Sequence, residues 1–594
     1  MPLSSRLARR ALSLAVFAAL CVSGAEAVAP NSVRVDAGST RTGNYLAALI
    51  ASADRDSAAA AVYYREALRS DPRNLDLTER AFASALAAGD GPAAFMLAER
   101  LLTHDAGNSL ARLSLAVRAI GEGQWSAARI QLAAGDAGKS HDITSNLVTA
   151  WSWAGSGDLR RALEAIDQIH DRGSDVFRNY YAGLIADVLG NPVEARRRLE
   201  LAYSGDKNIL RLADGYARFL ARHNDVEAAR HVYAEFSKTL PNHPVIKAAL
   251  ADLAAGKPLA PTVATARDGA AETLYGLGGA NSTRQGDELA ALIYLRLALM
   301  LRPDHDLAAV TVANLLSDMK QNEAAIRAYE SVPKTSPMRE SAEIQAALEV
   351  DTLGRSAEAT TRMKAIVEAY PGDPDAWSSL GSLQRAAKNF GDAAKSYDRA
   401  ITLIPVPDEA QWTLFYFRGI CLERDKQWPR AEADFKKALD IKPDQPLVLN
   451  YLGYSWVDQG VNLDDAFKML QRAVDLKPTD GYIVDSLGWA HFKLGHYDDA
   501  VKELERAIEL KPADPVVNDH LGDAYWRVGR TIEAHLQWNH ARDMDPDPED
   551  KPNILKKIAE GLPDLATAAP PPAATDAPAT PPAATDAPAP NSGG

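Results

Sequence analysis

The chain has 594 residues, of which 46% are hydrophobic, 24% charged and 7% aromatic, and its formal net charge is −14. This length exceeds what one hydrophobic core usually supports, so several domains or a repeat array are expected. The negative charge gives no general attraction to nucleic acid or anionic lipid, and the abundance of Ala and Leu favours helices over a β-rich fold.

Residues 1–27 have the pattern of a secretory signal peptide. The basic start consists of Arg6, Arg9 and Arg10, and a short apolar run follows at 11–22. Ala25-Glu26-Ala27 then supplies the small-x-small cleavage pattern. We therefore expect an exported, periplasmic protein that begins at Val28. No later segment is long and charge-free enough to span a bilayer, so no integral membrane segment is expected.

Cys21 leaves a second interpretation open, in which the cysteine is acylated and the protein is associated with the outer membrane. Leu20 precedes it, where lipoprotein signals normally carry Gly, Ala or Ser, so plain cleavage is favoured. After cleavage behind Ala27 only Cys421 remains, so no internal disulfide can form and packing must supply the stability.

Residues 41–243 are expected to form a divergent N-terminal array of about six units, in register with a clearer 34-residue repeat further along the chain. In 41–74, positions 20, 24, 27 and 32 are Ala60, Tyr64, Ala67 and Pro72. Residues 244–271 contain a Gly/Pro-rich stretch from Gly256 to Gly269, which predicts a linker between two arrays.

Eight contiguous units cover 272–548, the C-terminal array. Their period is marked by prolines spaced 34, 34, 34, 38, 35, 34 and 34 residues apart: Pro303, Pro337, Pro371, Pro405, Pro443, Pro478, Pro512 and Pro546. Each proline is expected to end the second helix of a unit, because it lacks the N–H that a continuing helix needs. Gly381, Gly488 and Gly522 at position 8 predict close approach of the two helices within a unit.

The C-terminal end carries two further predicted elements. Residues 549–562 are expected to form a short helix that caps the last unit. Residues 563–594 are rich in Pro, Ala and Thr and repeat PPAATDAPA twice, a composition that predicts a disordered tail.

The period and its residues resemble the tetratricopeptide repeat (TPR), which implies an all-α fold, an α-solenoid of stacked helix–turn–helix units. A narrower resemblance rests on 450–454 (NYLGY), 485–489 (DSLGW) and 520–526 (HLGDAYW). With the export signal, these motifs are similar to those of large proteobacterial envelope TPR proteins. One such protein is a lipoprotein adaptor that activates a carboxyl-terminal processing protease and presents cell-wall hydrolases to it.

In the TPR fold, as the resemblance implies, the first helix of each unit lines a concave groove with positions 2, 5, 9 and 12. The candidate partner-binding residues in the last four units are Tyr416, Asn450, Tyr454, Tyr482, Asp485, Trp489, Asp519, Asp523 and Trp526. Aromatic rings beside short polar groups are typical of binding hot spots. The alternative is that these aromatics belong to the core. The face has no pair of Lys or Arg residues, so it does not suit a peptide that ends in an acidic C-terminus. A peptide segment that is bound through its backbone, or a basic segment, fits better.

The sequence contains no phosphate-binding loop, dinucleotide fingerprint, H-E-x-x-H, C-x-x-C or G-x-S-x-G motif. We therefore expect no catalytic residues, no metal and no cofactor, and a protein that is not an enzyme. The predicted function is a protein-binding scaffold or adaptor in the bacterial cell envelope, with an envelope protease or cell-wall enzymes as suspected partners. The alternative is an assembly factor for surface polysaccharide or secretion machinery.

Overall fold

The computed structural model describes residues 40–135, 143–170, 173–282, 284 and 286–563. The expected signal peptide, Cys21 and the expected tail beyond Pro563 lie outside these residues. Over the described ranges the chain forms 30 α-helices and one short 3₁₀ helix, and no strand. The prediction of an all-α solenoid is confirmed.

Six helix pairs occupy the residues of the expected N-terminal array. In order they are α1 (Arg41–Ala53) and α2 (Ser57–Ser70), α3 (Leu75–Ala88) and α4 (Gly91–Leu102), α5 (Ser109–Gly121) and α6 (Trp125–Gly135), α7 (Ile143–Gly155) and α8 (Leu159–Asp167), α9 (Asp175–Val188) and α10 (Pro192–Gly205), and α11 (Leu210–Arg222) and α12 (Val226–Thr239). A single helix, α13 (Pro244–Ala254), follows them.

Eight further pairs and a last helix follow. They are α14 (Ala266–Ser282) and α15 (Glu288–Leu301), α16 (Asp306–Asp318) and α17 (Asn322–Glu330), α18 (Arg339–Thr352) and α19 (Ser356–Ala369), α20 (Pro374–Ala386) and α21 (Phe390–Thr402), α22 (Trp412–Arg424) and α23 (Trp428–Ile441), α24 (Pro446–Gln459) and α25 (Leu463–Leu476), α26 (Gly481–Lys493) and α27 (Tyr497–Leu510), α28 (Pro515–Arg527) and α29 (Thr531–Asp543), and α30 (Lys551–Glu560). The 3₁₀ helix η2 (Glu409–Gln411) precedes α22.

The periodic residues act where the sequence places them. Helices α23, α25 and α27 end two residues before Pro443, Pro478 and Pro512. Helix α28, which follows Pro512, begins with a side-chain cap: the Asp514 carboxylate accepts hydrogen bonds from the backbone N–H groups of Val516 and Val517 (2.9 and 3.1 Å). Such caps satisfy donors that have no partner inside the helix.

The position-8 glycines mark close contact within a pair. A methyl group added at Gly522 would lie 2.5 Å from Trp538 Cδ1, and one at Gly488 would lie 2.6 Å from Leu504 Cγ. A methyl group added at Gly381 would lie 3.1 Å from the ring of Tyr397. The expectation that these glycines let the two helices of a unit approach each other is confirmed.

The described chain divides into two compact units, residues 40–359 and 360–563, with the division inside α19. The expected boundary between two arrays at 244–271 is therefore not where the chain divides. That segment contains α13 and the first turn of α14, so it is only partly a linker.

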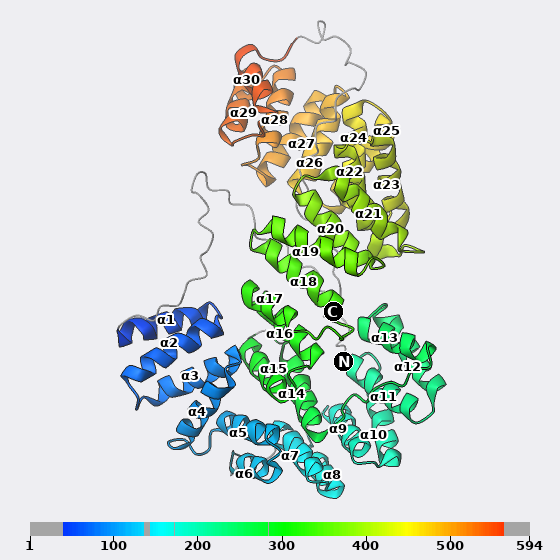
Figure 1. Cartoon of the computed structure of the whole chain (residues 1–594). Helices are drawn as coiled ribbons and strands as arrows, with labels where there is room; N and C mark the ends of the chain where they lie inside the picture. Colours follow the sequence, from blue (N-terminus) through cyan, green and yellow to red (C-terminus); the bar gives the residue numbers. More distant parts are fainter. Residues whose placement is uncertain (1–39, 136–142, 171–172, 283, 285, 564–594) are drawn as a thin grey trace. The chain divides into compact units, whose positions relative to one another are not determined.

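Within the first unit, α14 and α15 lie inside the arc formed by α1–α13 (Figure 1). Helix α14 packs on α7 and α9, and α15 packs on α3 and α5. Two glycines of α14 allow this contact: Gly269 lies directly against the ring of Trp151 and Gly276 against the hydroxyl of Tyr181. The Trp151 indole N–H also donates to Thr273 Oγ1 (2.9 Å).

A buried ionic network holds α14 at this place. Glu272 accepts two hydrogen bonds from Arg211 of α11 (2.7 and 2.8 Å) and one from the Tyr180 hydroxyl of α9 (3.2 Å). His305 Nε2, just before α16, lies 3.2 Å from the same carboxylate. Glu272 is 1% exposed. Although burial opposes it, the charge of Arg211 and the bond from His305 lower the pKa of Glu272, so the carboxylate stays ionised.

Candidate partner-binding surface

The first helices of three consecutive units, α24, α26 and α28, pack on one another in chain order. Each carries a candidate residue at position 5 and another at position 9: Asn450 and Tyr454, Asp485 and Trp489, Asp519 and Asp523. A spacing of four residues brings each pair to the same side of its helix. We call these six residues the A-helix set.

The A-helix set is mostly enclosed by the chain itself. Asn450, Tyr454, Asp485 and Asp523 are buried, and Trp489 and Asp519 are half-buried. Burial raises the pKa of Tyr454 well above its ordinary value, so its hydroxyl is neutral at physiological pH. The set therefore forms a tightly packed polar and aromatic ladder.

Asp485, His520 and Trp489 form one cluster across α26 and α28. His520 Nδ1 lies 3.0 Å from both carboxylate oxygens of Asp485. The imidazole stacks on the indole of Trp489 with ring centres 4.0 Å apart, and Phe492 stacks on the same indole at 4.8 Å. Burial lowers the pKa of His520, but the charge of Asp485 outweighs it and the net shift is upward.

Asp519 and Asp523 bind a lysine of the last helix. Lys557 Nζ of α30 lies 2.7 Å from Asp519 Oδ2 and 2.8 Å from Asp523 Oδ2. The other oxygen of Asp523 accepts the indole N–H of Trp538 (2.9 Å). Burial raises the pKa of Asp523 to about 6, against the opposing effect of Lys557. These two acids can therefore accept an ammonium group, and here α30 supplies it.

Trp526 is also engaged by the end of the chain. Its indole N–H donates to the carbonyl of Leu562 (3.2 Å), and its ring lies directly against Gly561. The neighbouring Arg527 donates to the carbonyl of Pro563 (2.7 Å). The segment after α30 thus covers Trp526 in the folded chain.

The remaining two candidates lie apart from the set. Tyr416 is 1% exposed and its ring packs against Phe435 and Tyr451, so it belongs to the core of the second unit. Tyr482 is half-buried, and the Lys511 ammonium lies 4.6 Å from its ring centre, a cation–π contact.

Three polar atoms of the A-helix set are buried and have no hydrogen-bond partner: Asn450 Oδ1, Trp489 Nε1 and Asp519 Oδ1. They come from α24, α26 and α28 in turn. Buried polar atoms are nearly always bonded in folded proteins, because an unbonded one costs about 1–3 kcal/mol. Unbonded buried atoms also occur elsewhere in the described residues, but here three of them lie on three adjacent helices.

Sequence reasoning missed two residues that organise this surface, His520 and Lys557. His520 follows position 5 of its unit, and only the stacking of adjacent units brings it to Asp485, 35 residues earlier. Lys557 lies in the expected capping helix, where one of three lysines turns inward while Lys551 and Lys556 are exposed. A charge count of that helix does not distinguish between the three.

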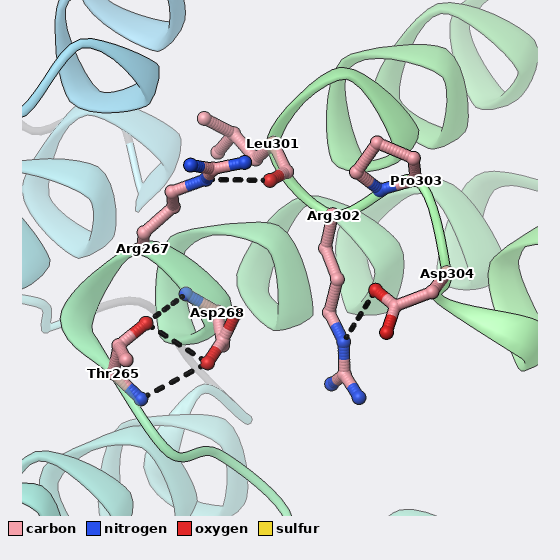
Figure 2. A pocket seen from close by; sticks show the side chains of 7 residues that line it. All are labelled: Thr265, Arg267, Asp268, Leu301, Arg302, Pro303 and Asp304. Carbon is pink, nitrogen blue, oxygen red and sulfur yellow. Dashed lines mark hydrogen bonds and ion pairs between the residues drawn. The ribbon is translucent and has the colours of Figure 1, made fainter.

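The first unit contains a cavity of about 420 Å³. Its polar groups already bind one another (Figure 2). Arg267 donates to the carbonyl of Leu301 (2.7 Å), and Asp268 accepts from the backbone and hydroxyl of Thr265 (3.0 and 2.8 Å). Arg302 lies 3.5 Å from Asp304. Two arginines are balanced here by two aspartates.

Over the described ranges, no group of three His, Cys, Asp or Glu side chains is arranged to bind a metal ion. None of the helices in this part of the chain has the length and apolar character needed to cross a membrane.

Comparison with protein families matches two stretches of the chain: residues 344–410 match a tetratricopeptide repeat model and residues 488–529 match a TPR repeat model. A TPR repeat-containing protein of Pseudomonas aeruginosa, PA4667, is 26% identical over 129 residues, which are 22% of this chain and 20% of that protein. The match thus spans about a fifth of the relative's length. The chain contains tetratricopeptide repeats.

Solved structures similar to the chain match it at low identity. A tetratricopeptide repeat protein from Parabacteroides merdae is 15% identical and covers 42% of this chain and 97% of its own, with a TM-score of 0.35. The Cut9–Hcn1 complex is 15% identical and covers 88% of this chain and 97% of its own, with a TM-score of 0.36.

Proposed function

We propose that this protein is a non-enzymatic scaffold that holds other proteins at the A-helix set, and that it works in the bacterial cell envelope. The observation that carries the binding proposal is the row of three partnerless polar atoms on α24, α26 and α28. A bound segment that supplies two donors and one acceptor would satisfy all three, and a polypeptide backbone presents both kinds of group.

The chemistry of the surface also indicates what the bound segment carries. Asp519 and Asp523 already accept one ammonium group, that of Lys557. Asp485 lies beside them, paired with His520. A segment with Lys or Arg next to an exposed backbone is attracted to such a site, whereas an acidic segment or a terminal carboxylate is repelled.

The envelope location rests on the signal-peptide pattern of residues 1–27. The resemblance of 450–454, 485–489 and 520–526 to envelope TPR proteins favours a carboxyl-terminal processing protease or cell-wall enzymes as partners. In this proposal the protein brings such an enzyme and its substrates together and catalyses nothing itself.

The test is a crosslinked capture of partners from envelope extract. It compares the full mature native chain with the same chain carrying Trp489→Phe. Phenylalanine keeps a ring against His520 and Phe492 but removes the indole N–H, so the fold is retained and a donor that has no partner within the chain is lost. We expect the identified partner to bind the variant about tenfold more weakly. This corresponds to a loss of roughly 1.4 kcal/mol of binding free energy.

Trp456→Phe is the matched control. Trp456 lies on α24 outside the A-helix set, and its N–H already donates to Glu432 (3.1 Å). The proposal stands if a protease or cell-wall enzyme is captured by the native chain and the control, and its affinity falls for Trp489→Phe. Equal affinity for all three chains, or capture that depends on polysaccharide, would contradict it.

A further inference from the structure

The first unit contains a second cavity, of about 270 Å³, with a different charge balance from the one in Figure 2. Its polar lining comes from the start of α2, from α15 and from the region of α17: Asp56, Ser57, Arg296, Gln321, Arg327 and Ser331. Two arginines thus face one aspartate. Ala87 at the end of α3 completes the wall beside Arg296.

The single acid of the cavity is already committed to the backbone. Asp56 Oδ1 accepts the N–H of Ala59 (2.9 Å) as the N-cap of α2. Gln321 is engaged too, because its side-chain amide donates to the carbonyl of Asp54 (3.1 Å). Ser331 donates its hydroxyl to the carbonyl of Ala328 (2.7 Å). The hydrogen bond from Ala59 leaves the charge of Asp56 in place, so the lining carries one negative and two positive charges and keeps a net positive charge.

Arg296 is half-buried and is positioned by one backbone contact. Its Nε donates to the carbonyl of Ala87 (3.3 Å), which leaves the terminal nitrogens free to reach other groups. Among the described residues, the ion pairs within 4.0 Å include neither Arg296 nor Arg327. Burial, and then the charge of Arg327, lower the pKa of Arg296.

An arginine that is partly removed from water beside a second arginine is an unfavourable arrangement unless an anion joins them. We propose that this cavity binds an oxyanion group, a phosphate or a carboxylate, of a small molecule, held between the guanidinium groups of Arg296 and Arg327. Guanidinium presents paired N–H donors in a plane that matches both kinds of anion. The volume also leaves room for the organic part of such a ligand.

Titration calorimetry on the full chain tests this site, with inorganic phosphate and acetate as separate probes at constant ionic strength. We expect heat of binding with one site per chain for at least one probe, and the responding probe tells phosphate from carboxylate. Arg296→Gln and Arg327→Gln should each weaken that binding at least tenfold. Absence of heat with both probes, or an affinity in both variants equal to that of the native chain, would overturn the proposal.

Arg267→Gln is the matched control, because Arg267 also donates its Nε to a backbone carbonyl but lies in the charge-balanced cavity. It should leave the affinity unchanged. Arg327 is exposed, so its variant keeps the test valid if Arg296→Gln fails to fold. Trp489→Phe should not affect this binding either, which separates the two proposals.

Discussion

Glu423 in α22 is a carboxylate in the core of the second unit. It is 2% exposed, one oxygen accepts the Tyr451 hydroxyl (3.1 Å), and the other has no partner. Burial raises the pKa of Glu423 above its ordinary value. The ionised form is therefore disfavoured in the folded chain relative to the unfolded chain.

This raised pKa predicts a pH dependence of stability. As the pH rises above about 4.5, the unfolded chain releases the proton first, so the free energy of unfolding of the native chain falls relative to that of Glu423→Gln. Below that pH both chains carry a neutral group and the difference is constant. Urea denaturation at pH 4 and pH 8 measures the change.

Glu432→Gln is the control for this prediction. Glu432 accepts the indole N–H of Trp456 (3.1 Å) and the ammonium of Lys436 (2.8 Å), and its side chain is 24% exposed. This variant shows how much of any change comes from replacing a glutamate outside the core by glutamine. A difference for Glu423→Gln that stays constant between pH 4 and pH 8 would mean that burial does not perturb this acid.

At the scale of single residues, the sequence predicted which side chains share a helix face but not how deeply they lie. The 34-residue period placed Asn450, Asp485 and Asp519 at one position, and the structure brings their helices together. Tyr416 is at the centre of an aromatic cluster because Phe435 and Tyr451 of neighbouring helices surround it. Period alone does not distinguish such a core position from a surface one.

Two adjacent glycines of α14 show how contact between helices depends on a single position. A methyl group at Gly278 would lie 2.7 Å from Leu295 Cγ of α15, whereas one at Gly279 would meet nothing within 4 Å. Gly278→Ala should lower the free energy of unfolding by roughly 1–3 kcal/mol, because the two helices must move apart. Gly279→Ala should raise it by roughly 0.5–1 kcal/mol, since alanine favours the helix. Denaturant titration of both variants provides the comparison, and equal shifts would contradict it.

At the scale of helices, the repeat pattern predicted most of the ends and failed between the arrays. Prolines at position 32 and acidic caps are local signals, so α23, α25 and α27 end where expected. Residues 256–269 were expected to be linker because Gly and Pro interrupt the pattern. Gly269 is instead a packing residue of α14, and its purpose depends on Trp151, which is more than a hundred residues away. The local amino-acid composition does not indicate a contact with such a distant residue.

For the first unit as a whole, Glu272 should be a decisive residue. It joins α14 to α9 and α11 and to His305, and its removal leaves the guanidinium of Arg211 buried without its main partner. Glu272→Gln should therefore lower the free energy of unfolding of this unit by roughly 3–5 kcal/mol. Amide hydrogen exchange of α9, α11 and α14 measures this loss of stability separately from the stability of the second unit.

The second unit provides the internal control, because its exchange should not change in Glu272→Gln. A matched variant is Glu288→Gln, whose carboxylate pairs with the exposed Arg55 at 3.5 Å. That change should cost less than about 1 kcal/mol. If both glutamate variants cost the same, the buried network does not hold the unit together.

At the scale of the molecule, the sequence predicted a solenoid of helix pairs but not its division. Repeat proteins are expected to contact only neighbouring units, which gives one continuous array or two arrays joined by a linker. The first unit departs from that expectation because α14 and α15 return to α3, α5, α7 and α9. Such a return needs complementary side chains at distant positions, and a single sequence gives no means of pairing them.

The return of α14 and α15 also has a mechanical consequence. An open stack of helix pairs behaves as a spring, since small changes at each junction add up to a large extension under load. In residues 40–359, α14 and α15 connect helices that are distant in the sequence. Extending this unit by force must therefore first break the contacts of Glu272 and Trp151. In residues 360–563 the main contacts join near neighbours, and that half of the molecule should stretch at lower force.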